Sequence, residues 1–385
     1  MKPTIRARLT LFGANGFIYG LNAVYYCLIQ KYLETIFVND PVTVGILLAI
    51  GPFVSIFAPI LWGYVADRSK SKNAVLALTV AFSAVFFLLI MFNDGPVYLA
   101  VMMGILMFFM SAYPGLIDII TIEYTAEAGI SYGFIRIFGT VAFGVTPMIL
   151  TSFTETNIDI IFYAYVLMAA AAVLSILLAP RVKGHGSGDN KTSFAPIFKD
   201  YRLMLLFLFS AITMFTWTYY MNFFPGHLSG TLQQPESVWG INTFLTVLGE
   251  IPFFLAFNRL FDKVGIKKLM LISFVLVVAR YAGLAMLTNV PALLALGLIT
   301  GFATTVFTYC ASVYINKYIA PENKASANSM LYALGNGIPR VLAGVLGGTM
   351  TEFMGYKLSM IVCTVLCAAA FGIFLLTFGR DKAFK

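Results

Sequence analysis

The sequence GYVADRSKSK at residues 63–72 lies between two long apolar segments, and NRLFDKVGIKK at residues 258–268 repeats its pattern in the second half. Each copy places an Asp directly before a basic residue, Asp67–Arg68 and Asp262–Lys263, and the copies lie half a chain length apart. One basic turn is a common feature, but a matched pair at this separation indicates two related halves. We expect both copies to form tight turns between consecutive membrane-spanning helices.

The composition around these turns is that of a membrane protein. Of the 385 residues, 60% are apolar and only 11% are charged. A soluble domain carries about 25% charged residues, so an ordinary globular fold, a disordered chain and a disulfide-stapled module are excluded. A membrane-spanning helix needs about 20 mostly apolar residues. The chain therefore has room for roughly a dozen spans joined by short loops.

Twelve apolar stretches predict an all-α polytopic membrane protein. Their approximate limits are residues 9–33, 42–66, 74–93, 96–122, 131–153, 157–180, 203–227, 237–261, 267–288, 291–316, 324–350 and 355–379. After the sixth comes the longest polar stretch, residues 181–200, whose Gly, Ser and mixed charges are typical of a flexible linker. We therefore expect an N-terminal six-helix bundle at 1–180, a linker at 181–202 and a C-terminal six-helix bundle at 203–385.

The basic residues predict the orientation of the spans. Most of the 25 Lys and Arg residues lie at the termini, in the linker and in the loops after spans 2, 8 and 10, whereas the opposite loops carry only Lys31 and Lys357. The positive-inside rule then places both termini and the linker in the cytoplasm. This bias accounts for the net charge of +8, so no nucleic-acid partner is expected. From the short loops we expect a monomer in a bacterial inner membrane.

No metal or cofactor site is expected. The four cysteines, at positions 27, 310, 363 and 367, all lie in apolar runs, where they act as small apolar side chains. The two histidines, His185 in the linker and His227 at the outer end of span 7, are not placed for a proton relay at the membrane midplane. No HExxH, GxSxG or phosphate-loop motif stands out, so an enzyme is not expected.

The motif at residues 63–72 resembles the signature loop of the major facilitator superfamily, G-x-x-x-D-[RK]-x-G-x-[RK]-[RK]. Lys70 stands where the family has Gly, and the second copy keeps that Gly. With twelve spans and a central linker, the resemblance covers the whole chain. An Asp beside helix N-termini and an Arg can latch two bundles together. The resemblance implies a gating role for Gly63, Asp67, Arg68, Asp262, Lys263 and Gly265.

Five charged residues fall within the predicted spans: Asp118, Arg136, Glu250, Arg280 and Arg340. A charge near the midplane costs roughly 2.5–3.5 kcal/mol on insertion scales, so each needs a partner or a water-filled cavity. These residues mark a solute pathway, or else they form structural ion pairs. Asp118 in span 4 and Arg136 in span 5 can face each other across adjacent antiparallel helices, which keeps both ionised.

The first of these pairs resembles the lactose permease branch of the superfamily, with the related phenylpropionate permeases and nucleoside–proton symporters. In that branch an acidic residue in span 4 and an Arg in span 5, at this same 18-residue spacing, bind the sugar. An aromatic residue two turns after the Arg stacks on it. The resemblance implies Asp118, Arg136 and Phe143 as substrate ligands.

The second half matches that branch in part. Glu250 in span 8 and Arg280 in span 9 resemble its acidic and Arg positions, but the His and Glu that handle protons in span 10 fall here at Thr300 and Ala303. Glu250 is then the expected proton carrier, with Asp118 second, and Arg280 would stabilise the ionised carboxylate. Arg340 in span 11 could bind an anionic substrate group or only reach towards an interface.

Polar and aromatic residues of spans 1 and 7 are further candidates. Tyr19, Asn22 and Tyr26 follow helical spacing, so they share one face of span 1. Trp217 and Tyr220 lie in span 7. Because these spans are central in the superfamily's fold, these residues would line the substrate cavity. The alternative is packing and an aromatic belt near the membrane interface.

These features predict a secondary transporter whose two bundles rock around a midplane site. We expect proton-coupled uptake of a small polar solute, with a saccharide or nucleoside first and a small aromatic acid second. An exporter of drugs or metabolites and an uncoupled facilitator are the alternatives. Span 5 lacks the Gly-Pro-x-x-Gly-Gly motif that is common in exporters of the superfamily.

Overall fold

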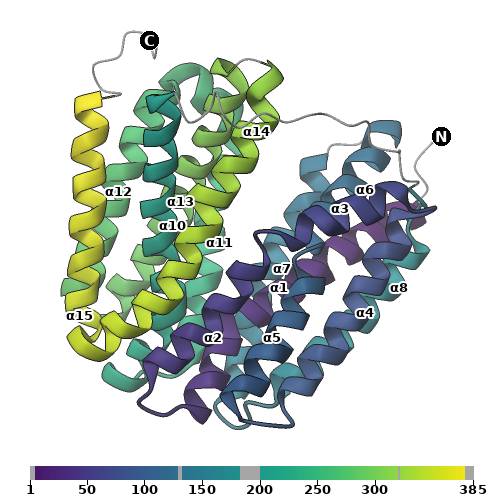
Figure 1. Ribbon diagram of the computed structural model, residues 1–385, viewed down its shortest axis with the longest axis horizontal. Helices are drawn as coiled ribbons and strands as arrows, with labels where there is room; N and C mark the ends of the chain where they lie inside the picture. The colour runs from purple at the N-terminus through teal and green to yellow at the C-terminus, as the bar shows by residue number, and fades with distance from the viewer. Residues whose placement is uncertain (1–4, 129–131, 183–199, 320, 378–385) are drawn as a thin grey trace. The chain divides into compact units, whose positions relative to one another are not determined.

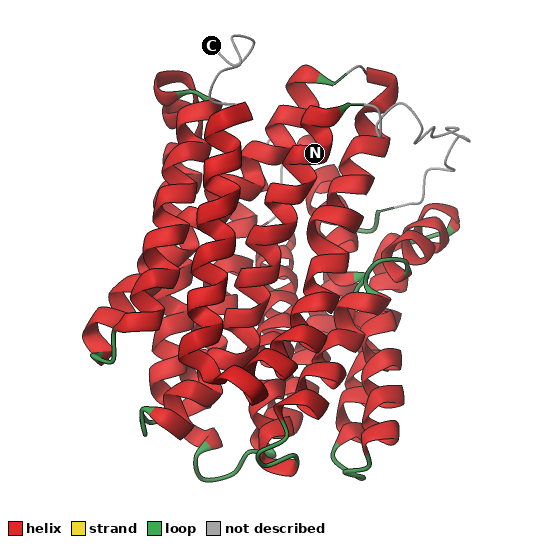
Figure 2. Cartoon of the chain, turned by 60° about the vertical axis from the view of Figure 1, so that its left-hand side comes forward, coloured by secondary structure: helices red, strands yellow, loops and turns green. Residues whose placement is uncertain are grey.

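The computed structural model describes residues 5–128, 132–182, 200–319 and 321–377. These residues form helices and short connecting loops, and none of them lies in a strand (Figure 2). This confirms the all-α prediction.

The chain forms two compact units (Figure 1). Unit 1 comprises residues 1–39, 50–189 and 235–240, and unit 2 comprises residues 40–49, 190–234 and 241–385. The helices from the first half of the chain are α1 (Ile5–Ile36), α2 (Pro41–Val54), α3 (Ala58–Arg68), α4 (Lys72–Ile90), α5 (Pro96–Met110), α6 (Tyr113–Ala128), α7 (Tyr132–Thr154) and α8 (Ile160–Leu178). Those from the second half are α10 (Tyr201–Gly226), η1 (His227–Thr231), α11 (Ser237–Val264), α12 (Ile266–Met286), α13 (Val290–Tyr318), α14 (Pro321–Tyr332), η2 (Ala333–Gly337) and α15 (Ile338–Thr377).

The long helices account for the predicted spans. Nine helical segments of the described chain are long and apolar enough to cross a membrane, and one of these, Ala327–Thr377, contains both of the last two predicted spans. Those two spans meet at Gly355, whose φ of 71° is a left-handed conformation that favours glycine. The remaining two predicted spans correspond to α1 and α11, helices of 32 and 28 residues.

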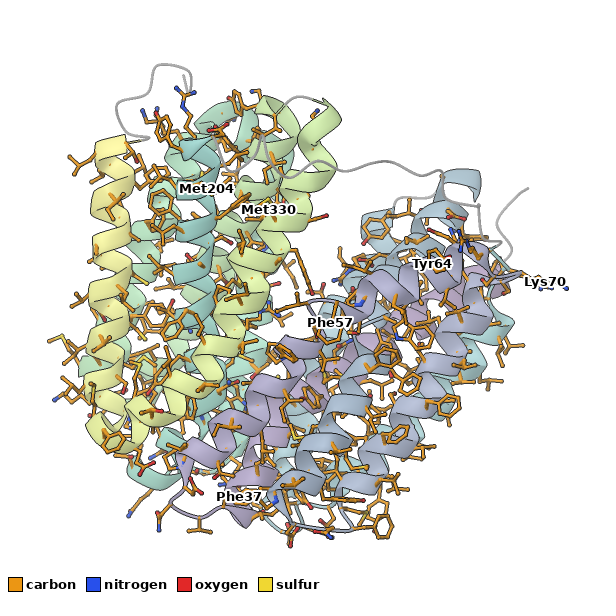
Figure 3. All side chains as sticks on the ribbon, in the orientation of Figure 1. Phe37, Phe57, Tyr64, Lys70, Met204 and Met330 are labelled. Atoms are coloured by element: carbon orange, nitrogen blue, oxygen red, sulfur yellow. The ribbon has the colours of Figure 1, made fainter. Side chains whose placement is uncertain are left out.

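Two of the predicted spans are broken into shorter helices. The second divides at residues 55–57 into α2 and α3, and the fourth divides at residues 111–112 into α5 and α6. Figure 3 labels Phe57 at the first break. Proline contributes to this break, because Pro52 cannot donate a backbone hydrogen bond and Pro59 occupies the first turn of α3, where that loss has no cost.

Unit 1 is held together by the close approach of α1 to α7 and α8. A Cβ added at Gly20 would lie 2.2 Å from Cε of Met168 and 3.1 Å from Oγ1 of Thr146, so a larger residue would have to displace the end of the Met168 side chain. Tight packing of this kind replaces the hydrophobic effect as the force between helices in lipid. It fixes α1 beside α7, the two helices that carry the polar residues discussed below (Figure 1).

The start of α11 also belongs to unit 1. Glu236 forms an ion pair with Lys31, with 3.2 Å between Oε1 and Nζ, and its Oε2 accepts a hydrogen bond from Thr154 at 2.7 Å. Trp239 donates from Nε1 to the carbonyl of Cys27 at 2.9 Å. The first residues of α11 are therefore anchored to the ends of α1 and α7.

Unit 2 has an aromatic core that joins α10, α12, α13, α14 and α15. Phe209, Phe274 and Phe374 lie at its centre, and the ring centroid of Phe274 lies 5.6 Å from that of Phe209 and 5.3 Å from that of Phe374. Phe253 of α11 belongs to the same core, and α11 crosses α13 at backbone contact, because a Cβ at Gly301 would lie 1.8 Å from the carbonyl oxygen of Thr246. Glycine at this position permits that approach.

Candidate functional site

The charged residues predicted to pair in unit 1 do meet. Nε of Arg136, in the first turns of α7, lies 3.5 Å from Oδ1 of Asp118, on α6. Tyr19 of α1 donates its hydroxyl to the same oxygen, also at 3.5 Å. The three helices α1, α6 and α7 thus contribute to one charged cluster, in which Tyr132 of α7 also hydrogen-bonds to Asp118 and Arg136.

Arg136 is also fixed from its other sides. Its guanidinium carbon lies 3.8 Å from the centroid of the Tyr19 ring, a cation–π contact. Nη1 donates to Oγ1 of Thr140 at 3.1 Å, one turn further along α7. These contacts hold the guanidinium plane in one orientation. The group has five N–H donors, which is more than the number of acceptors that surround it. Donors therefore remain for a solute.

The pair is accessible, although it lies within apolar helices. The side chains of Arg136 and Asp118 are 29% and 32% exposed. An ion pair open to hydrocarbon would be costly, and intramembrane charges therefore face the protein interior or a water-filled path. By this argument the exposed part of the pair faces water rather than lipid. A polar solute would reach the pair from that water-filled side.

The other predicted residues of unit 1 lie on α1 and α7. Phe143 is half-buried, two turns after Arg136. Asn22 is 6% exposed and donates Nδ2 to the carbonyl of Ile18 at 3.0 Å. Tyr26 is half-buried, and its ring lies edge-on to Tyr25 at 5.2 Å. Asn22 thus uses one amide N–H within its own helix, and Phe143 and Tyr26 each keep part of their surface accessible.

Gly139 gives a direct test of the Tyr19–Arg136 contact. A Cβ at Gly139 would lie 2.4 Å from Cδ2 of Tyr19, so Gly139→Ala must displace the ring. We expect the apparent affinity for the transported solute to fall roughly tenfold, the size of a lost cation–π contact at a partly desolvated site. Concentration-dependent uptake measures this.

The matched control is Gly115→Ala on α6, because nothing lies within 4 Å of a Cβ there. We expect its affinity to equal that of the wild type. Equal affinities in all three proteins would show that the Tyr19 ring does not support Arg136.

In unit 2, Arg280 and Glu250 lie on α12 and α11. Arg280 is 1% exposed, with its guanidinium carbon 4.1 Å from the Tyr220 ring centroid and 4.9 Å from that of Tyr281. Glu250 is half-buried on the face of α11 that approaches α13, where a Cβ at Gly301 would lie 3.0 Å from its Cγ. The predicted proton carrier therefore sits at a tight helix crossing, and the predicted helper arginine lies among aromatic rings.

The remaining predicted ligands of unit 2 belong to two separate groups of contacting side chains. Arg340, at the start of α15, lies over Trp217 with 5.4 Å from its guanidinium carbon to the ring, and Nη2 points at Sδ of Met214 at 3.8 Å. Tyr220 is 2% exposed and receives a hydrogen bond from Nδ2 of Asn242. Arg340 and Trp217 thus form one pair, and Tyr220 belongs with Arg280.

The first copy of the sequence motif, at residues 63–72, forms a local charge network. Nζ of Lys72, which is almost fully buried, lies 2.5 Å from Oε1 of Glu123 and 3.9 Å from Oδ1 of Asp67. Arg68 covers the ring of Tyr64 at 3.9 Å. A Cβ added at Gly63 would have no atom within 4 Å, so packing does not require glycine at this position.

In Figure 3 the side chain of Lys70 points away from the ribbon. In the second copy of the motif, Gly265 has a φ of 79° and precedes α12, which explains why glycine is kept there. Lys263 is exposed, and the side chain of Asp262 lies outside the described residues.

Several residues of these clusters, or the contacts that they make, were not predicted from the sequence. Thr140 follows Arg136 by one helical turn, so the spacing in the sequence could have identified it as a neighbour of Arg136. The position of Tyr19 under Arg136 depends on the closeness of α1 to α7 at Gly139, which the sequence does not display. The contacts of Asn242 and Tyr281 could likewise be identified only from the tertiary structure.

Comparison with known proteins gives permeases as relatives. The uncharacterized transporter YwbF of Bacillus subtilis is 25% identical over 349 residues, covering 88% of this chain and 85% of the relative. The nucleoside permease NupG of Escherichia coli is 26% identical over 86% of both chains, and the maltose permease of Geobacillus stearothermophilus is 25% identical over 90% of this chain and 88% of that one. The crystal structure of NupG superposes with a TM-score of 0.86 over 97% of this chain and all of that chain, at 20% identity.

The helical membrane fold, the charges held within its spans and these relatives define a multi-pass membrane transporter rather than an enzyme. The chain belongs to the MFS_1 like family, whose family model it matches over residues 11–362.

Proposed function

We propose that the protein is a secondary transporter that couples proton movement to the uptake of a small polar solute, with a saccharide or a nucleoside as the first candidate. The observation that carries this proposal is the accessible Asp118–Arg136 pair, whose atoms lie 3.5 Å apart within apolar helices. Such a pair suits a solute rich in hydroxyl groups. The guanidinium can donate two parallel hydrogen bonds to vicinal hydroxyls, and the carboxylate can accept from others.

Phe143 supplies the apolar part of this proposed site. It lies two turns after Arg136 on α7 and is half-buried, so one surface is available for a sugar ring or a base to stack. The names of two relatives, a nucleoside permease and a maltose permease, support the same two solute classes. The remaining proposed ligands are Asn22, Tyr26, Trp217, Tyr220 and Arg340.

The proton is proposed to bind Glu250, with Asp118 as the second candidate. A carboxylate among apolar helices binds and releases a proton as its hydration changes. Motion would follow the predicted division of the chain, with helical bundles at residues 1–180 and 203–385 rocking about the linker at 181–202. We place the protein as a monomer in a bacterial inner membrane with both termini cytoplasmic, and we assign the two gating motifs to the latch between bundles.

Reconstituted proteoliposomes test the proposal. Radiolabelled nucleosides, saccharides and small aromatic acids are offered with an inward proton gradient, and again after a protonophore has removed that gradient. We expect a nucleoside or saccharide to accumulate above its external concentration only while the gradient persists. Equilibration that is insensitive to the protonophore would indicate a facilitator instead, and accumulation of lipophilic drugs alone would indicate an exporter.

A further inference from the structure

Arg280 has an unusual environment for a charged residue. It lies on α12 and is 1% exposed. Its guanidinium carbon lies 4.1 Å from the ring centroid of Tyr220 and 4.9 Å from that of Tyr281. Its Nη1 donates to the hydroxyl of Tyr281 at 3.4 Å. A buried guanidinium ordinarily has an anionic partner and a full set of hydrogen bonds, because an uncompensated charge in an apolar environment is strongly unfavourable.

The rest of the guanidinium lacks such partners. Nε and Nη2 of Arg280 are both buried and have no hydrogen-bond partner in the described part of the chain. These two nitrogens lie on the same edge of the group, so their N–H bonds run nearly parallel and form the fork that binds anions in a bidentate manner. Arg136 in unit 1 differs, since its Nε faces the carboxylate of Asp118.

A third unpartnered donor lies in the same unit. Tyr356, on α15, is 7% exposed, and its hydroxyl also has no hydrogen-bond partner among the described residues. It interacts electrostatically with both Arg280 and Tyr220. Its ring is held by stacking on His227, at 4.0 Å between centroids, so the hydroxyl has a fixed position. The thiols of Cys363 and Cys367 lie on the same helix near Arg280.

The chemistry of this cluster selects its ligand. The two guanidinium nitrogens can only donate hydrogen bonds and the Tyr356 hydroxyl can also donate one, which favours a ligand that accepts hydrogen bonds. The single positive charge is balanced by one negative charge, and the near-complete burial of Arg280 leaves no opening for a large molecule. We propose that Arg280 and Tyr356 form a binding site for a small monovalent anion, a halide or a small carboxylate, within unit 2. The proposal depends on the unpartnered nitrogens of Arg280 and not on the identity of the transported solute.

The purified wild-type protein tests the proposal without knowledge of its transported solute. The melting temperature is measured at constant ionic strength while the bulky HEPES anion is replaced by chloride or, in a second arm, by formate. We expect a saturable rise in melting temperature, because a ligand that binds the native state stabilises it by mass action. A rise with chloride identifies a halide site, and a rise with formate alone identifies a carboxylate site. No rise in either arm would overturn the proposal.

Three variants connect such a rise to the site. Arg280→Gln should abolish the anion response, and Tyr356→Phe should weaken the apparent affinity roughly fivefold, as for one lost hydrogen bond. Arg202→Gln, which removes an arginine at the start of α10 that lies against its neighbour Tyr201, should respond like the wild type. A wild-type response in Arg280→Gln would overturn the assignment.

Anomalous diffraction from wild-type crystals grown in bromide tests whether an anion binds at Arg280, even if Arg280→Gln fails to fold. We expect a bromide peak within hydrogen-bonding distance of Nε and Nη2 of Arg280, provided that chloride stabilises the protein. For a carboxylate-selective site, the same position is examined in crystals grown in formate. An empty fork in the crystals grown with the stabilising anion would contradict the proposal.

Discussion

Replacing Arg136 by alanine is expected to abolish both solute binding and transport. The variant loses the fork that would hold the solute hydroxyls and leaves Asp118 without the guanidinium 3.5 Å away. Hydrogen bonds to charged groups contribute about 1.5–3 kcal/mol each, so the loss of two weakens binding on the order of 100-fold or more. Uptake of the solute into proteoliposomes, with the amount of inserted protein held equal, measures the effect.

Two further variants make the result specific. Arg136→Lys keeps the charge but cannot donate a bidentate pair, and we expect intermediate affinity. Arg202→Ala removes an arginine at the start of α10 that lies against its neighbour Tyr201, and uptake should be unchanged. If Arg136→Ala transported at the wild-type rate, Arg136 would have only a structural role.

Replacing Glu250 by glutamine is expected to uncouple transport from the proton gradient while sparing solute exchange. Glutamine keeps the shape of the side chain at the α11–α13 crossing but cannot carry a proton. A gradient of one pH unit stores about 1.4 kcal/mol per proton, so one coupled proton supports roughly tenfold accumulation of solute. The wild type should approach that ratio, whereas the variant should stop at equal concentrations inside and outside.

The control for this prediction is Glu352→Gln, an exposed carboxyl group on α15 that we assign no role. It should accumulate solute like the wild type. Exchange of internal for external solute, measured without a gradient, shows whether Glu250→Gln remains folded and able to bind. Uphill accumulation by Glu250→Gln would remove Glu250 from the proton pathway and leave Asp118 as the candidate.

Much of the fold could be predicted because long apolar runs and the distribution of basic residues act locally. The meeting of Asp118 and Arg136 was also predictable, since consecutive antiparallel helices bring such positions together. The breaks within the spans were harder to predict from the sequence. The interruption at residues 55–57 lies inside a continuous apolar run, and its prolines are too common in membrane helices to signal a break by themselves.

The details of the clusters depend on contacts between distant segments. Tyr19 reaches Arg136 only because Gly139 allows α1 and α7 to approach closely. Arg280 is enclosed by Tyr220 from α10 and lies close to Tyr356 from α15, far away in the sequence. Spacing along one helix contains no information about such partners, so the sequence identified Arg280 as notable without indicating its burial or its open fork.

The most direct test of the account is a thermal-shift screen of the purified wild-type protein and Arg136→Ala against nucleosides, saccharides and small aromatic acids. A ligand at about 100 times its Kd stabilises the native state by about 2.7 kcal/mol, which raises the melting temperature measurably. We predict that a nucleoside or saccharide raises the melting temperature of the wild type and leaves that of Arg136→Ala unchanged. Stabilisation of both proteins to the same extent, and only by lipophilic compounds, would contradict a polar solute site at Asp118 and Arg136.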